Sequence, residues 1–242
     1  MQLRVDLVAS VAKDLQRQEL NEDAYAVGKT CVALADGASE SYDSRTWARL
    51  LTQAYTLDQQ ISVQWVAERV RTYLQSTDFA SLSWSRQAAF ERGSFATLLG
   101  LELALNGVEI DVLAIGDSLA VHVRDGVMVE SFPFKFAKEF DARPQLISTL
   151  STANAFVEEP DFFTKNSTTW QVQTGDQILL ATDAIGHWIL AHTEALADLY
   201  SISSVAEFEQ LVVARRQDRS MRLDDSTILR ILVDADDQEQ KT

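Results

Sequence analysis

The chain has 242 residues, of which 46% are hydrophobic and 24% are charged, a composition that is ordinary for one globular domain. Its formal net charge is −15, which argues against a nucleic-acid partner, since such proteins need a basic surface, and against an anionic membrane. The single cysteine, Cys31, excludes a disulfide within the chain.

The first part of the chain predicts a strand, a hairpin and then helices. Apolar residues alternate with polar ones over residues 3–7, which indicates an opening strand. Residues 25–27 and 30–35 read as a hairpin that turns at Gly28-Lys29. Helical spacing of apolar side chains then predicts three helices, over residues 47–54, 66–74 and 84–92. Three tryptophans on these helical patterns are expected in the core: Trp47, Trp65 and Trp84.

From residue 95 onward the hydrophobic pattern changes to that of short strands. Asn-Gly, Gly-Asp and Asp-Gly dipeptides separate four apolar runs, which predicts an antiparallel meander over residues 95–105, 108–115, 119–123 and 127–132. Residues 133–168 are less regular and are expected to form a flap. The last part predicts strands over 170–172, 178–181 and 227–233 and helices over 185–199 and 205–215. This order favours an α+β fold of two sheets with helices outside.

Acidic side chains stand next to predicted strands at places far apart in the sequence. Asp36, Asp117 and Asp183 each follow the end of an apolar run, and Asp224-Asp225 precedes the run at 228–233. A carboxylate at the end of a buried strand is costly unless it is paired or holds a cation. Several such carboxylates therefore predict convergence on one divalent-cation site with oxygen ligands.

The wording and order of these segments resemble the metal-dependent protein phosphatases, the type 2C serine/threonine phosphatases, in their minimal bacterial form. Six segments match in family order: Asn21-Glu22-Asp23-Ala24, residues 32–37 ending in Asp36-Gly37, Gly93-Ser94-Phe95-Ala96-Thr97, Gly116-Asp117-Ser118, Ala181-Thr182-Asp183-Ala184 and Asp224-Asp225-Ser226-Thr227. The match spans roughly residues 20–233, so we expect one domain over 1–233 and an acidic tail over 234–242. The resemblance implies a four-layer α-β-β-α sandwich of two mainly antiparallel sheets, with a metal site at one edge between them.

The resemblance also implies the site. Two Mn²⁺ or Mg²⁺ ions, with a weaker third, would be held about 3.5–4 Å apart and would carry the hydroxide that attacks the phosphoryl group. An all-oxygen ligand set suits these ions better than zinc. Asp36 would bridge the ions, and Gly37 would offer its backbone carbonyl. The full implied ligand set, in which Asp36, Asp183 and Asp224 are also the catalytic residues, is Glu22, Asp36, Gly37, Asp117, Asp183 and Asp224.

Three positions depart from the family pattern. The family often has a phosphate-binding arginine three residues before the Asn of Asn-Glu-Asp, where this chain has Gln18, and we take the neighbouring Arg17 as its replacement. His187 stands where some members have a further Asp, which would weaken the third ion site. Asp225 replaces the usual Asn and is expected to support the site without binding an ion.

These features favour a metal-dependent phosphatase that hydrolyses phosphoserine and phosphothreonine esters in a signalling system. Its partner would be a phosphoprotein made by a serine/threonine kinase. Two alternatives stay open: a catalytically weak or inactive phosphatase-like binding module, which Gln18 favours, and a hydrolase of small phosphate esters. The first residues lack the apolar core of a signal peptide, and no apolar stretch approaches the roughly 20 residues of a membrane span, so we expect a cytoplasmic monomer.

Overall fold

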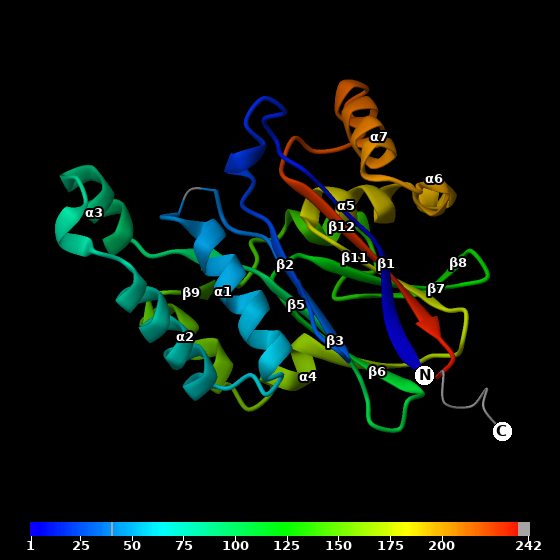
Figure 1. The fold of residues 1–242 in the computed structure, drawn as a ribbon, viewed down its shortest axis with the longest axis horizontal. Coiled ribbons are helices and arrows are strands. Elements are labelled where there is room, and N and C mark those ends of the chain that lie inside the picture. The colour runs from blue at the N-terminus through cyan, green and yellow to red at the C-terminus, as the bar shows by residue number, and fades with distance from the viewer. Residues whose placement is uncertain (40, 237–242) are drawn as a thin grey trace.

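The computed structural model describes residues 1–39 and 41–236. Two five-stranded sheets pack face to face, and helices cover the outer face of each sheet (Figure 1). The strand pairs of both sheets are antiparallel. This is the α-β-β-α sandwich that the sequence predicted.

The first sheet contains the two long strands from the ends of the chain. Its strands lie in the order β1 (Gln2–Val11), β12 (Ser226–Asp234), β11 (Gln177–Ala181), β7 (Leu119–Arg124) and β8 (Val127–Phe132). Its outer face is covered by α5 (Asp183–Ala191), α6 (Leu196–Ser201) and α7 (Val205–Gln217). Gln2 lies opposite Asp234, so the start of β1 and the end of β12 are side by side (Figure 1).

The second sheet holds the predicted hairpin. Its strands lie in the order β10 (Ser167–Gln171), β6 (Glu109–Ile115), β5 (Leu98–Leu103), β3 (Cys31–Ala35) and β2 (Ala24–Val27). Helix α1 (Ser44–Leu57) covers its outer face, α2 (Val63–Ser76) packs against α1, and α3 (Trp84–Glu91) lies at the far end of this layer (Figure 1).

Strand β3 explains why some strands read as continuous apolar runs. Cys31, Ala33 and Ala35 face the helix layer that begins with α1, whereas Val32 and Leu34 face the other sheet. All five side chains are buried. A strand covered on both faces needs apolar residues at every position, and so it shows no alternation.

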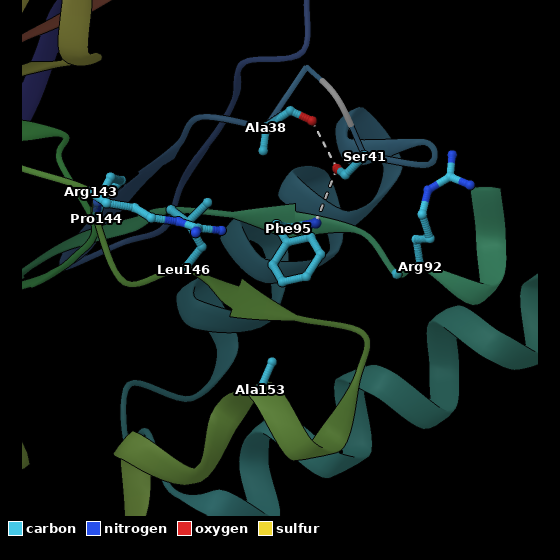
Figure 2. A pocket seen from close by; sticks show the side chains of 9 residues that line it. Ala38, Ser41, Arg92, Phe95, Arg143, Pro144, Leu146 and Ala153 are labelled. Atoms are coloured by element: carbon cyan, nitrogen blue, oxygen red, sulfur yellow. Dashed lines mark hydrogen bonds between the residues drawn. The ribbon is translucent and has the colours of Figure 1, made fainter.

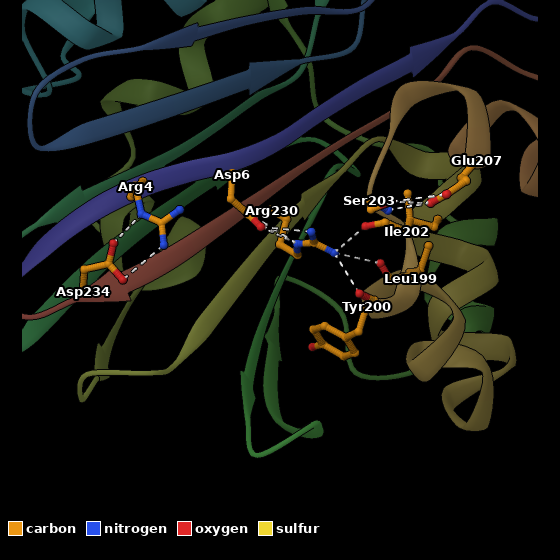
Figure 3. A network of polar contacts seen from close by, with 9 residues as sticks. All are labelled: Arg4, Asp6, Leu199, Tyr200, Ile202, Ser203, Glu207, Arg230 and Asp234. Carbon is orange, nitrogen blue, oxygen red and sulfur yellow. Dashed lines mark hydrogen bonds and ion pairs between the residues drawn. The ribbon is translucent and has the colours of Figure 1, made fainter.

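Arg230 of β12 ties α6 to the first sheet (Figure 3). Its side chain is largely buried, and Nη2 donates to Asp6 Oδ2 of β1 at 2.9 Å. Nη1 donates to the carbonyl oxygens at the end of α6, those of Leu199, Tyr200 and Ile202, at 3.0–3.2 Å. Helix ends leave such carbonyls without partners inside the helix. The arginine thus satisfies a helix end and pairs with its own counter-ion.

The predicted flap is an ordered excursion between the two sheets. It contains the 3₁₀ segments Ala137–Asp141 and Ser151–Glu158, the strand β9 (Ile147–Ser148) and the helix α4 (Phe162–Asn166). Strand β9 pairs with β4 (Phe95–Ala96) in a separate two-stranded sheet. None of the helices in the described part of the chain is long and apolar enough to cross a membrane.

Several sequence-based expectations were wrong in detail. The runs over 95–132 do not form one meander, because β5 and β6 lie in one sheet and β7 and β8 in the other. The helix expected over 185–199 is interrupted by the 3₁₀ turn Thr193–Ala195. Trp47 and Trp65 are buried as expected, but Trp84 is 84% exposed.

The last strand ends at the start of the predicted tail. Strand β12 continues to Asp234, which pairs with Arg4 across the sheet (Figure 3). The division into a domain over 1–233 and a tail over 234–242 stays a prediction, and residues 237–242 lie outside the described part of the chain.

Candidate metal centre

Strand ends from both sheets meet at one edge of the sandwich. In the first sheet, Ala181 lies opposite Leu119 and Ile228. In the second, Leu34 lies opposite Leu99, and Leu98 opposite Ile115. The register therefore places the acids that adjoin β11 and β12 at one edge of the first sheet, and the acids that adjoin β3 and β6 at one edge of the second.

The acids line a shared pocket. Asp36 and Gly37 after β3, Asp117 between β6 and β7, and Asp224 before β12 line a cavity of about 200 Å³. Asp183, the first residue of α5, lies close enough for its charge to act on Asp36. The structure thus places four of the six predicted ligand positions around one pocket, with a fifth, Asp183, near it.

The Gly-Ser-Phe-Ala-Thr segment fixes the strand ends around Asp36. The Asp36 N–H donates to Thr97 Oγ1 at 2.8 Å, and the Thr97 N–H donates to the Asp36 carbonyl at 2.9 Å. Thr97 Oγ1 also shares a hydrogen bond of 2.9 Å with Ser118 Oγ. Three of the six sequence segments are therefore held together by one buried pair of hydroxyls.

Gly37 is required by a close approach of the Glu22 segment. A Cβ at Gly37 would lie 2.9 Å from the Glu22 carbonyl oxygen and 2.9 Å from Ser44 Cβ. Such contacts are too short for any side chain. The glycine thus brings the Asn-Glu-Asp segment against the end of β3, where Glu22 is the sixth predicted ligand.

Two further acids act as hydrogen-bond acceptors. Asp225 is buried, and its carboxylate oxygens accept the backbone N–H groups of Lys13 and Glu22, each at 2.7 Å. Asp23 accepts the hydroxyls of Thr227 at 2.6 Å and Thr182 at 3.2 Å. Both carboxylates fasten neighbouring segments, which agrees with the supporting role expected for Asp225.

Asp225→Asn is expected to lower the free energy of unfolding by about 1–3 kcal/mol, because the new amide group would face one of the two backbone N–H donors. We expect turnover to fall less than about tenfold, since Asp225 binds no ion in this account. Urea denaturation of the metal-free protein measures the first effect, with the exposed Glu194→Gln as control. A loss of turnover as deep as that of Asp224→Asn would instead make Asp225 the ligand.

The clustered carboxylates raise the pKa of one another. Burial, followed by the charges of Asp23 and Asp183, holds the pKa of Asp36 well above its usual value. Burial, followed by the charges of Asp117 and Asp224, raises the pKa of Asp183 to about 7. Within the described ranges, Asp183 Oδ1 is buried without a hydrogen-bond partner. Mutual repulsion and an orphaned carboxylate oxygen fit a divalent cation as the counter-charge.

The carboxylates do not form a finished ligand shell. Among residues 1–39 and 41–236, no three His, Cys, Asp or Glu side chains are gathered closely enough to hold an ion together. The fit to a cation therefore rests on the donor set and the orphaned oxygen, and side chains would have to close on the ion.

Solved structures match nearly the whole chain, whereas no family model and no curated protein sequence matches it. The serine/threonine phosphatase PstP/Ppp of Mycobacterium tuberculosis has a TM-score of 0.58 and 19% identity, covering 97% of this chain and 100% of that chain. The PPM phosphatase MsPP of Mycobacterium smegmatis has a TM-score of 0.53 and 17% identity, and the match covers 93% of this chain and 96% of that chain. The catalytic domain of PstP in complex with two manganese ions has a TM-score of 0.56 and 21% identity, and the match covers 96% of this chain and 98% of that chain. The chain has the fold of the PPM serine/threonine phosphatases.

On this PPM fold, one cation near the acids escaped the sequence analysis. Lys13 Nζ is 3.4 Å from Glu22 Oε2 and donates to Ser39 Oγ, which lines the carboxylate pocket. Partial burial lowers its pKa, but the charges of Glu22, Asp224 and Asp225 outweigh this effect and leave the pKa raised. Lys13 stands two residues past the end of β1. The position of Lys13 just after a strand end is the sequence feature that could have identified it as a candidate site residue.

The positions that depart from the PPM pattern have other partners. Arg17 is 59% exposed in its side chain, and its Nε lies 3.8 Å from Glu19 Oε1. The Gln18 side chain accepts the N–H of Ala12 at 3.1 Å, which folds the loop back onto the end of β1. The His187 ring packs edge-on against Phe140. The role of Arg17 in phosphate binding stays a prediction.

Proposed function

We propose that this chain is a metal-dependent phosphoprotein phosphatase that hydrolyses phosphoserine and phosphothreonine esters. The observation that carries the proposal is the convergence of Asp36, Asp117 and Asp224 on one pocket, with Asp183 beside it, on a PPM fold. The PstP structure with two manganese ions supports two Mn²⁺ or Mg²⁺ ions as cofactors. When bound, such ions activate water and stabilise negative charge on the phosphoryl oxygens.

The residues of this chain would hold the ions and orient the substrate. Asp36 would lie between two ions, and Asp183 and Asp224 would complete the first ion's shell. The carbonyl of Gly37 and Glu22, the latter directly or through water, would serve the second, and Asp117 a weaker third. Glu22 is oriented by Ser44, whose hydroxyl donates to Oε1, and by Lys13 next to Oε2. The carboxylates must be ionised to bind cations.

We further infer that the substrate is a phosphoprotein produced by a serine/threonine kinase, within cytoplasmic signalling, and that the protein acts as a monomer. A non-catalytic binding module has less support, because such a module would not need to keep costly, mutually repelling carboxylates in one pocket. Nucleic acids are poor partners for a chain with a net charge of −15.

The proposed function is tested by phosphate release from a phosphothreonine peptide and from a chromogenic phosphate ester. We expect activity with Mn²⁺ or Mg²⁺, none after exhaustive chelation, and recovery when the ion is returned. Faster turnover of the peptide at equal concentration supports a phosphoprotein substrate. Full activity in chelator would contradict the metal mechanism, and hydrolysis of small esters alone would favour the metabolite hydrolase.

Two cations compete for the role of phosphate binder, Arg17 from the sequence and Lys13 from the structure. If Arg17 binds the phosphate, Arg17→Ala is expected to raise KM with little change in kcat. The loss of about 1.5–3 kcal/mol for a charged hydrogen bond corresponds to about 10- to 150-fold. Lys13→Met is the matched comparison, since it keeps the length of the side chain and removes the charge. A higher KM for Lys13→Met alone would move the role to Lys13.

A further inference from the structure

A second, larger pocket, whose lining is drawn in Figure 2, shares lining residues with the carboxylate pocket. Its volume is about 490 Å³, and Ala38, Pro144 and Leu146 line both pockets. A ligand can therefore extend from the carboxylates into the larger pocket past these three residues. Because it also holds Arg92 and Arg143, we call this larger pocket the arginine groove.

The arginine groove is built on the small sheet of β4 and β9. Phe95 of β4 lines it, as does Leu146, the residue before β9. Ser41 Oγ donates to the Ala38 carbonyl at 2.8 Å and accepts the Phe95 N–H at 3.2 Å (Figure 2). These bonds tie Ala38 and Ser41 to Phe95 of the small sheet.

The two arginines stand on opposite sides of Phe95 (Figure 2). Arg92 precedes β4 and Arg143 precedes β9, and the antiparallel pairing of these strands separates the two positions. Both side chains are exposed. Within residues 1–39 and 41–236 neither side chain forms an ion pair, and the Arg92 side chain makes one hydrogen bond, to the Ala88 carbonyl. Their charges are free to meet a ligand.

We propose that the arginine groove binds the segment of the phosphoprotein substrate next to the phosphoresidue and selects segments that carry Asp or Glu. The proposal rests on the proposed function and adds a sequence preference to it. With the phosphoryl group among the carboxylates, the substrate chain passes Pro144 and Leu146, and its acidic side chains meet Arg143 and then Arg92. A guanidinium binds a carboxylate through two parallel hydrogen bonds.

The charge of the whole protein favours the opposite preference. A net charge of −15 attracts basic peptides, and it repels acidic ones at long range. At physiological ionic strength such forces are screened beyond about 8 Å. Inside the groove the two arginines therefore determine which peptides bind more tightly. A measured preference for acidic peptides would point to the groove, because the net charge of the protein alone predicts the opposite preference.

The test uses three phosphothreonine peptides that differ only in carrying Glu, Gln or Lys at the positions on both sides of the phosphothreonine. Fluorescence anisotropy gives their affinities with a non-hydrolysable phosphonate in place of the phosphate, and phosphate release gives kcat/KM. We expect the Glu peptide to exceed the Gln peptide by at least about threefold in both, because exposed ion pairs are individually weak but two act together. The Lys peptide is expected to be the weakest.

Variants assign the preference to the groove. Arg92→Gln/Arg143→Gln is expected to bring the ratio between the Glu and Gln peptides to about one, and Arg143→Glu to turn it toward the Lys peptide. Arg71→Gln removes another exposed arginine, on α2 and outside the groove, and should keep the wild-type ratio. Thermal melting of each variant checks that it is folded.

Failure of the groove and failure of the function give different results. Hydrolysis of all three peptides at equal rates, with equal affinities, would contradict the proposed preference of the groove and would still support the phosphatase activity. Selective binding of the Glu phosphonate that is lost with the two arginines, without hydrolysis of any phosphopeptide, would support the groove and refute the phosphatase. A loss of preference in Arg71→Gln as large as that in the groove variants would also overturn the proposal.

Discussion

Asp36→Asn is expected to lower the turnover of a phosphothreonine peptide by at least about a hundredfold, because it removes the charge that would lie between two ions. The backbone at Asp36 is held by Thr97 through N–H and C=O bonds that an asparagine keeps. The fold should therefore survive the change, so that the loss reports the carboxylate. Asp183→Asn and Asp224→Asn are expected to show losses of similar depth.

Asp125→Asn is the matched control for these substitutions. Asp125-Gly126 repeats the Asp-Gly dipeptide of Asp36-Gly37, but it forms the turn between β7 and β8, with Asp125 at φ 53°. Asparagine tolerates this left-handed conformation. Wild-type rates are expected for Asp125→Asn. Near-normal rates for Asp36→Asn, Asp183→Asn or Asp224→Asn would mean that the ligand assignment is wrong at that position.

The metal-free protein is expected to lose stability through its acidic cluster as the pH rises. The pKa of Asp183 in the folded state is about 7, above the value of about 3.9 for an unperturbed aspartate. A raised carboxyl pKa means that the folded state holds the proton more tightly than the unfolded state. Stability from this group is thus complete below about pH 4 and is lost as the pH rises through about 7.

Comparison with Asp183→Asn isolates this effect from other titrating groups. At pH 8 in chelator the variant should melt at a higher temperature than the wild type, because it lacks one of the repelling charges. The difference should shrink toward pH 5, where Asp183 is largely protonated. Saturating Mn²⁺ should reverse the order, because the wild type then gains a bound ion. An equal melting temperature at pH 8, or a gap that widens toward pH 5, would contradict the electrostatic account.

The sequence carried much of the fold because its strands and acids leave local signals. Asp36, Asp117 and Asp183 each end an apolar run, and the alternation and turn dipeptides located β2, β3, β5 and β6. The same local signals do not determine which strands pair with one another. Gly116-Asp117-Ser118 looks like a hairpin turn, yet it passes from one sheet to the other, because the face that each strand buries is settled by the rest of the sandwich.

The sequence did not reveal those parts of the site whose residues are far apart in the chain and come together only in the fold. Lys13 is an ordinary lysine after a strand until the fold brings it to Glu22. Arg92 and Arg143 are 51 residues apart and share a pocket only because β4 pairs with β9. The prediction that Trp84 lies in the core was wrong because its local sequence pattern was misleading. It has a helical neighbourhood, but α3 buries none of its side chains fully.

Anomalous X-ray diffraction from crystals grown with Mn²⁺ tests the central claim, that these carboxylates hold divalent ions, most directly. We expect two manganese peaks about 3.5–4 Å apart. Asp36 should lie between them, with Asp183 and Asp224 on one ion and the Gly37 carbonyl facing the other. Crystals that show no manganese in this pocket at saturating Mn²⁺, or manganese bound only elsewhere on the chain, would contradict it.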